Sequence, residues 1–98
     1  MALLVLNCDG VDLTTHKLVG DVITIGRAPL NHIVIDNPSV SAQHAMLARV
    51  GHSYRLKDLR STNGTQVNGV PITDAELKDG DKIRFGPVVA VFAGAYPK

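Results

Sequence analysis

Short runs of β-favouring residues, separated by turn residues, dominate the pattern of hydrophobic and polar positions along the chain. Eight runs are predicted to be strands: Ala2–Asn7, Val11–Leu18, Val22–Ile25, His32–Ile35, His44–Val50, Ser53–Leu59, Lys82–Phe85 and Val88–Phe92. Within Lys82–Phe85, Ile83 and Phe85 alternate with two basic side chains, which is the period of a strand with one buried face. No segment keeps a helical period, and only Asp74–Leu77 is expected to form a single helical turn.

Four pairs of turn residues mark where the chain reverses: Asp9-Gly10, Asn63-Gly64, Asn68-Gly69 and Asp79-Gly80. Gly and Asn tolerate positive φ, which tight hairpin turns need. Asn68-Gly69 therefore predicts a small hairpin between Thr65–Val67 and Val70–Ile72. Roughly ten short, regularly spaced strands favour an all-β fold, and we expect a β-sandwich. The chain has no internal repeat and no linker, so residues 1–98 are interpreted as a single domain.

The composition narrows the possible ligands. A net charge of +1 argues against a general nucleic-acid or membrane-surface binder, which usually has a basic excess. The single cysteine, Cys8, makes neither an internal disulfide nor a cysteine-rich zinc site, and the histidines lack paired metal-ligand spacing. No signal peptide or membrane-spanning segment is evident. We therefore expect a monomeric intracellular, cytoplasmic domain without metal or cofactor.

Polar side chains gather in the two segments that interrupt the strand pattern, residues 27–41 and 60–64. Arg27 offers a planar fork of donors that suits the oxygens of an anion. Ser41 and Thr62 add hydroxyl donors, and Asn63 and Asn68 donate and accept at once, which suits a peptide backbone. Together these groups indicate a site for a phosphate carried on an extended peptide.

Each of these residues also has a purely structural interpretation. Arg27 could be a surface charge, or it could pair with a carboxylate such as Asp36. Ser41 follows a turn-rich stretch, and Asn63 and Asn68 precede glycines, so turn geometry alone could explain all three.

An enzyme is a further alternative, because Ser41, His44 and Asp58 are the residue types of a hydrolytic triad. The sequence argues against it, since no Gly-x-Ser-x-Gly elbow surrounds Ser41 and a thin sandwich offers little room for a catalytic cleft. We therefore expect a binding protein and no enzyme.

The motifs, taken together, resemble the forkhead-associated (FHA) domain family. They are Gly26-Arg27, Ser41-x-x-His44, Asp58-Leu59-x-Ser61-Thr62-Asn63-Gly64-Thr65, Val67-Asn68-Gly69, and Asp79-Gly80-Asp81 with Ile83 and Gly86. The resemblance runs from the first strand to the last. It implies a two-sheet sandwich of about eleven short, mostly antiparallel strands, with binding loops at one end. It also implies a signalling module that recognises phosphothreonine in partner proteins modified by a Ser/Thr kinase.

The resemblance assigns roles to the polar residues. It implies that Arg27 and Ser41 hold the phosphate and that Thr62 lines the same site. Asn63 and Asn68 would hydrogen-bond the peptide backbone around the phosphothreonine.

The resemblance also implies a supporting set behind the ligand. His44 would brace the binding loops without touching the peptide. Gly26 and Gly64 would serve backbone geometry. Asp58 is expected to satisfy backbone donors within its loop.

Two positions depart from the family's pattern. Ala42 stands where many members have a polar residue, and Ser39 stands where some have a basic one. Arg60, at the variable position of the Asp58–Gly64 stretch, is expected to compensate by contacting the phosphopeptide. The departures leave one alternative function open, which is an FHA-fold scaffold or oligomerisation module that binds proteins without phosphate.

Overall fold

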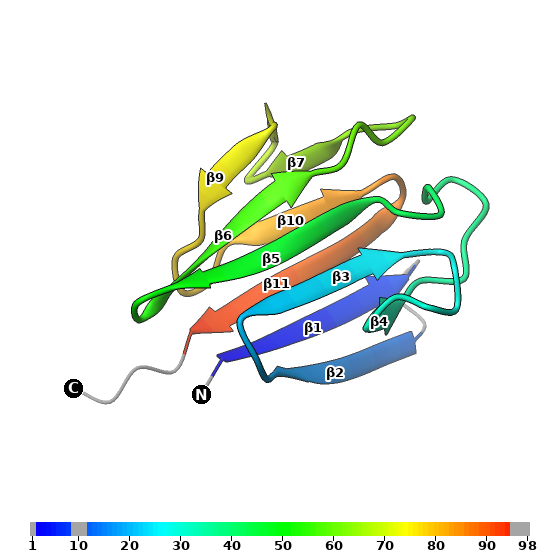
Figure 1. The fold of residues 1–98 in the computed structure, drawn as a ribbon. Coiled ribbons are helices and arrows are strands. Elements are labelled where there is room, and N and C mark those ends of the chain that lie inside the picture. The colour runs from blue at the N-terminus through cyan, green and yellow to red at the C-terminus, as the bar shows by residue number, and fades with distance from the viewer. Residues whose placement is uncertain (1, 9–11, 95–98) are drawn as a thin grey trace.

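The computed structural model describes residues 2–8 and 12–94, and every regular element within those ranges is a β-strand. The strands are β1 (Ala2–Cys8), β2 (Asp12–Leu18), β3 (Val22–Gly26), β4 (Ile33–Val34), β5 (Ala45–Val50), β6 (Ser53–Asp58), β7 (Thr65–Val67), β8 (Val70–Ile72), β9 (Asp74–Glu76), β10 (Lys82–Phe85) and β11 (Val88–Gly94). They form a six-stranded sheet in the order β2-β1-β11-β10-β7-β8 and a five-stranded sheet in the order β4-β3-β5-β6-β9 (Figure 1). The predicted eleven-stranded sandwich is confirmed. Its strands are mostly antiparallel, and the short β3–β4 pair is parallel.

The two sheets enclose one hydrophobic core because their strands alternate between buried and exposed positions. In β10, Ile83 and Phe85 are buried, whereas Lys82 and Arg84 face solvent. The largest fully buried apolar side chains are Phe85, Phe92, Leu4, Ile25, Leu47, Leu56, Ile83, Val40 and Val88. Burial of each such side chain stabilises the fold by about 1.5–3 kcal/mol. The core thus gives the loops a rigid base.

The hairpin at Asn68-Gly69 is also confirmed. Antiparallel pairing joins β7 to β8, and Asn68 and Gly69 have φ of 52° and 83°. Both values lie in the left-handed region that a two-residue hairpin turn of type I′ requires. Asn and Gly are the residues that enter this region most readily, so the local sequence determines this turn.

The predicted helical turn at Asp74–Leu77 is wrong. Asp74–Glu76 instead forms β9, which pairs antiparallel with β6. A hydrogen-bonded ion pair from Arg55 Nε to Asp74 Oδ1, at 2.9 Å, reinforces this pairing. Long-range pairing therefore overrides the local helix propensity of the Asp-Ala-Glu sequence. Several strand ends also shift by a residue or two, while the Asp9-Gly10 turn and Val11 lie outside the described residues.

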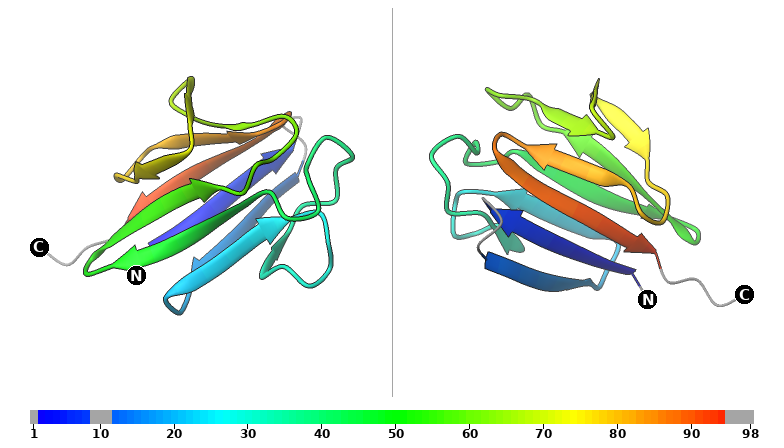
Figure 2. Two further views of the ribbon diagram at one scale, coloured as in Figure 1. Left: turned by 45° about the horizontal axis from the view of Figure 1, so that its top comes forward. Right: turned by 180° about the vertical axis from the view of Figure 1, so that it is seen from behind.

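The loops that carry Arg27, Ser41, Arg60, Thr62 and Asn63 lie together at one end of the sandwich. The β3–β4, β4–β5 and β6–β7 loops project from this end, whereas the β2–β3 and β5–β6 turns lie at the opposite end (Figures 1 and 2). The β7–β8 turn that carries Asn68 lies at the other end of β7, beside Lys82 at the start of β10. The described residues contain no helix with the length and apolar character needed to cross a membrane.

Candidate functional site

Ser41 joins the three loops at the binding end. Its backbone carbonyl accepts the Arg27 N–H at 3.0 Å, which fastens the β4–β5 loop to the end of β3. Its hydroxyl oxygen accepts the Thr62 N–H at 3.0 Å, which fastens the β6–β7 loop to the same point. Because the Ser41 Oγ acts as acceptor here, its own O–H remains able to donate to a ligand. The Thr62 side chain is exposed beside it.

Arg27 is exposed and pre-positioned by one hydrogen bond. Its Nε donates to the Val40 carbonyl at 3.0 Å, which fixes the side chain along the β4–β5 loop. The ion pairs among the described residues are Arg49–Asp21 and Arg55–Asp74, so the alternative pairing of Arg27 with Asp36 is wrong. The terminal nitrogens of the guanidinium remain available for an anion.

His44 lies directly behind these loops and is fully buried. Its Nδ1 accepts the Ser41 N–H at 3.1 Å, so Nε2 carries the ring hydrogen and donates it to the Gly64 carbonyl at 2.9 Å. This pattern selects the neutral imidazole. The ring also packs edge-on against Phe85, with centroids 5.5 Å apart. His44 thus connects the β4–β5 and β6–β7 loops to the core.

The Asp58 carboxylate holds the β6–β7 loop in shape. It accepts hydrogen bonds from the Ser61 hydroxyl, from the Ser61 N–H at 3.2 Å and from the Thr65 hydroxyl at 2.7 Å. Burial opposes ionisation, but the Ser61 and Thr65 hydrogen bonds outweigh it and lower the pKa of the Asp58 carboxyl.

These contacts also exclude the triad. Both ring nitrogens of His44 are occupied by backbone groups, of Ser41 and Gly64, so neither is hydrogen-bonded to the Ser41 hydroxyl or to Asp58. The Asp58 carboxylate is engaged by its own loop. The three residues are therefore structural neighbours and not a catalytic relay.

Gly26 allows the β3–β4 and β4–β5 loops to approach closely. A Cβ at this position would lie 2.3 Å from the Ala42 carbonyl oxygen, which is well inside contact distance. The Asn31 amide closes the same junction, since Nδ2 donates to the Ala28 carbonyl at 2.9 Å and to the Ala42 carbonyl at 2.7 Å. Asn31 was not among the predicted site residues, because its partner lies in another loop and no local motif marks it.

The two asparagines differ in how many hydrogen-bonding groups they leave free. Asn63 Nδ2 donates to the Ser39 carbonyl at 2.7 Å, so its Oδ1 and second N–H remain available. Asn68 Nδ2 donates to Asp81 Oδ1 at 2.9 Å, and its Oδ1 accepts the Lys82 N–H at 3.0 Å. Asn68 thus holds its own hairpin against β10 and has a single N–H left for a ligand.

Arg60 adopts an unusual backbone conformation at the rim of the site. Its φ of 56° is one of two positive values among the non-glycine residues of the described ranges. The left-handed region costs an L-residue of this kind about 1–2 kcal/mol, and the Asp58–Ser61 contacts hold the loop in it. The Arg60 side chain is exposed and lies in the same β6–β7 loop as Thr62 and Asn63.

The fold and site together define a β-sandwich in which exposed polar and basic side chains gather on the loops at one end. The family model of the FHA domain matches residues 23–86. The chain therefore belongs to the FHA domain family, whose members are non-enzymatic binding modules.

Known relatives agree with this assignment. The transcriptional regulatory protein EmbR of Mycobacterium tuberculosis is 46% identical over 70 residues, which cover 70% of this chain and 18% of EmbR. A solved FHA domain, studied for phosphothreonine-dependent interactions, superposes with a TM-score of 0.87 at 31% identity and covers 98% of this chain and 99% of its own. EmbR in complex with a low-affinity phosphopeptide superposes with a TM-score of 0.85 at 31% identity, over 98% of this chain and 25% of that chain. The chain spans less than half the length of the curated relatives it matches first.

Proposed function

We propose that this chain is a phosphothreonine-reading module of a kinase signalling system. Arg27, Ser41 and Thr62 hold the phosphate, and Asn63 binds the peptide backbone beside it. Asn68 contributes its remaining N–H, and Arg60 adds a cation at the rim.

One observation carries this proposal. The Ser41 Oγ is bonded as an acceptor to the Thr62 N–H, within a loop to which Arg27 Nε is also fastened. A free hydroxyl hydrogen and the ends of an exposed guanidinium are thereby brought to one place, before any ligand arrives. Donors fixed in advance lose little conformational entropy on binding, so they favour an anion with several oxygens.

Phosphate chemistry fits these donors in charge and number. A phosphothreonine carries about −1.5 to −2 charges at pH 7 and three acceptor oxygens. Hydrogen bonds to charged groups contribute roughly 1.5–3 kcal/mol each. Three or four of them, less the ordering cost, give an affinity of about −8 kcal/mol, which is micromolar. High salt and acidification below about pH 6 should both weaken binding.

The relatives support this ligand class, since one was studied for phosphothreonine-dependent interactions and another was solved with a phosphopeptide. We extend the proposal to the whole chain. Residues 1–98 act as one monomeric domain in the cytoplasm, without enzymatic activity of its own. Its partner is a protein phosphorylated by a Ser/Thr kinase, and neither nucleic acid nor membrane is a ligand.

The proposal is tested by titrating ¹⁵N-labelled protein with pooled phosphothreonine peptides, and with phosphoserine and unphosphorylated pools of the same sequences. We expect saturable amide shifts confined to Arg27, Ser41 and the segment 60–68, only with phosphothreonine, and their loss in Arg27→Ala. Arg49→Ala, which removes an exposed arginine at the opposite end, is the matched control and should bind like the wild type.

Binding that does not depend on phosphate would instead support the alternative of an FHA-fold scaffold. We would draw the same conclusion if Arg27→Ala left every amide shift unchanged. In either case the loops at the end of the sandwich would lose their assigned role as a phosphate site.

A further inference from the structure

A hollow on the outer face of the six-stranded sheet carries two basic side chains. It measures about 190 Å³, and its lining includes Gln66 on β7, Asn68 and Gly69 of the β7–β8 turn, Lys82 and Arg84 on β10, and Val89 on β11. Lys82 and Arg84 point outward, since the residues that alternate with them in β10 are buried in the core. The right-hand view of Figure 2 shows this sheet in front.

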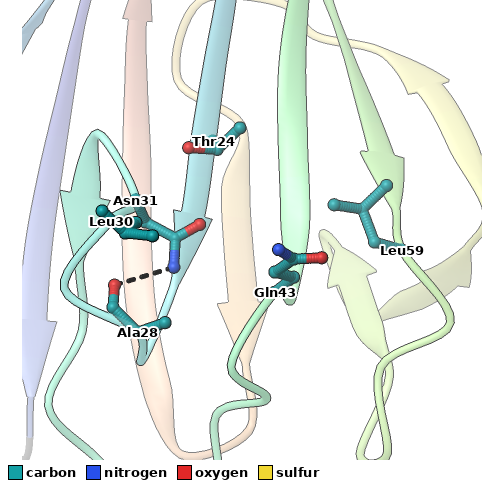
Figure 3. Close-up of a pocket in the computed structure, with 6 residues that line it drawn as sticks. All are labelled: Thr24, Ala28, Leu30, Asn31, Gln43 and Leu59. Atoms are coloured by element: carbon teal, nitrogen blue, oxygen red, sulfur yellow. Dashed lines mark hydrogen bonds between the residues drawn. The ribbon is translucent and has the colours of Figure 1, made fainter.

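This hollow differs in charge and position from a larger one near the binding loops. The larger hollow measures about 290 Å³ and is lined by Thr24, Ala28, Leu30, Asn31, Gln43 and Leu59 (Figure 3). None of these six side chains is charged, and the hollow borders the proposed phosphate site, so it belongs to the site already described. The basic hollow lies on the other sheet, beside a turn at the far end of β7 from the β6–β7 loop.

The two cations of the basic hollow lack partners within the protein. Among the described residues, neither the Lys82 ammonium nor the Arg84 guanidinium takes part in a hydrogen bond or an ion pair, and both side chains are exposed. The strands β1, β7, β8, β10 and β11 contain no acidic residue. The carboxylate that precedes Lys82, that of Asp81, already accepts two hydrogen bonds. On the other sheet, by contrast, Arg55 is paired with Asp74 at 2.9 Å. This face therefore keeps a positive potential that attracts an anionic ligand.

Each cation stands opposite a valine of the adjacent strand. The register pairs Lys82 with Val91 and Arg84 with Val89. Val91 is 36% exposed, and Val89 forms part of the wall of the hollow. Side chains that are directly opposite in an antiparallel pair have Cβ atoms about 5 Å apart, so one ligand segment reaches a cation and a valine together. This mixture favours a protein segment over a single-stranded nucleic acid, whose binding grooves combine basic with aromatic side chains.

The spacing of the cations matches an extended peptide. A strand rises about 3.4 Å per residue, so the Cα atoms of Lys82 and Arg84 lie about 7 Å apart. Carboxylates at alternate positions of an extended segment have the same spacing, because alternate side chains project from the same side. The planar guanidinium of Arg84 suits a carboxylate that accepts two parallel hydrogen bonds, and Lys82 adds a point charge. The amide of Gln66, which the register places opposite Arg84, adds a further donor.

We infer that this face binds an acidic, extended segment of a partner protein, with two carboxylates, two residues apart, on Lys82 and Arg84. Aliphatic side chains of the same segment cover Val89 and Val91. The surface is separate from the binding loops, so it acts independently of phosphate recognition and leaves those loops free for a second ligand. A second copy of the chain does not suit it, because two such faces would bring like charges together.

The test titrates ¹⁵N-labelled protein with a peptide whose alternate residues are valine, glutamate, glutamate and valine, separated by serines. We expect saturable amide shifts at Gln66, Lys82, Arg84, Val89 and Val91, and affinity that falls as salt is added. The same peptide with glutamine in place of glutamate should bind about tenfold more weakly or not at all.

Variants of the two cations identify the contact. Lys82→Gln and Arg84→Gln should each weaken the glutamate peptide about fivefold. Lys57→Gln, which removes a basic side chain from β6 on the other sheet, is the matched control and should bind like the wild type. The double variant Lys82→Glu with Arg84→Glu should reject the glutamate peptide and bind a peptide with lysine in its place, a reversal that a merely structural role of the cations would not produce.

Three results would overturn the inference. One is the absence of saturable shifts on this face, or equal binding of the glutamate and glutamine peptides. Another is shifts at Arg27 and the segment 60–68 that disappear in Arg27→Ala, because the acidic peptide would then occupy the binding loops. The third is flotation with phosphatidylserine vesicles that depends on Lys82 and Arg84 while the glutamate peptide does not bind, which would assign the face to a membrane. Phosphothreonine titrations report on the loops alone, so the proposed function and this inference can each fail without the other.

Discussion

The Ser41 hydroxyl oxygen accepts the Thr62 N–H at 3.0 Å, across 21 positions of the sequence. This contact sets the separation of the β4–β5 and β6–β7 loops. It also leaves the Ser41 hydrogen directed away from Thr62, so the residue serves as a brace and as a donor at once.

The first prediction follows from this dual role. Ser41→Ala removes a donor to the phosphate and the acceptor of the Thr62 N–H. One charged hydrogen bond contributes about 1.5–3 kcal/mol, so we expect phosphopeptide affinity to fall at least tenfold in calorimetric titrations. Ser53→Ala, at the start of β6 and far from the loops, is the control. An unchanged affinity in Ser41→Ala would remove Ser41 from the phosphate site.

The second prediction concerns His44. His44→Ala leaves the Ser41 N–H and the Gly64 carbonyl without partners and opens a space beside Phe85. We expect a loss of about 2–4 kcal/mol in the free energy of unfolding, measured with urea, and faster hydrogen exchange at the Ser41 amide. His52→Ala, in the exposed β5–β6 turn, should change neither. If His44→Ala weakened binding but kept full stability, His44 would act on the ligand and not as a brace.

Much of this architecture could be predicted from the sequence because its causes are local. The alternation in Lys82–Phe85 and the Asn68-Gly69 turn depend on neighbouring residues alone, and both are as predicted. The Asp74–Leu77 prediction failed because pairing with β6 decides that segment. Asn31 was missed for the same reason, since its partner Ala42 lies in a different loop.

The sequence suggested which residues form the candidate site, but it could not give their geometry. Residue types and spacing suggested Arg27, Ser41 and Thr62, yet only the structure shows that the Ser41 oxygen is the acceptor and that Arg27 is fastened to Val40. The sequence also could not show which side-chain hydrogen-bonding groups of Asn63 and Asn68 remain free, because that depends on their contacts with Ser39 and with β10.

The third prediction is a pH dependence from Asp58. Its folded-state pKa lies below the unfolded value of about 3.9, so the folded state binds fewer protons. The stability this provides is fully present above about pH 5 and is lost as the pH falls through the folded pKa. Asp58→Asn should therefore be less stable than the wild type at pH 7, and the difference should shrink by pH 3 in urea unfolding. Asp36→Asn, which changes an exposed carboxylate outside this loop, is the control. If the difference in stability between the wild type and Asp58→Asn stayed constant from pH 7 to pH 3, the prediction would be contradicted.

The fourth prediction tests the loop junction at Gly26. In Gly26→Ala the new Cβ meets the Ala42 carbonyl, so the loops must separate. We expect a cost of about 1–3 kcal/mol, a fall in Tm of several degrees and weaker phosphopeptide binding, because Ser41 moves with Ala42. Gly51→Ala is the control, because Gly51 has a φ of 62° and a Cβ at this position would meet nothing within 4 Å. Gly51→Ala should lower the stability through backbone strain but leave the phosphopeptide affinity unchanged. If Gly26→Ala bound the phosphopeptide as tightly as the wild type, the junction would not position the site.

The fifth prediction separates the two asparagines. Asn63 keeps Oδ1 and one N–H free, whereas Asn68 uses both ends of its amide on Asp81 and Lys82. Asn63→Ala should therefore reduce phosphopeptide affinity about tenfold or more with little change in stability. Asn68→Gly, which keeps the left-handed turn, should destabilise the protein by about 1 kcal/mol and lower the affinity only a few-fold. Calorimetric titration and urea unfolding of both variants provide the comparison. The reverse order of affinities would mean that the single free N–H of Asn68, and not the amide of Asn63, anchors the peptide backbone, and that the β7–β8 hairpin is part of the binding surface.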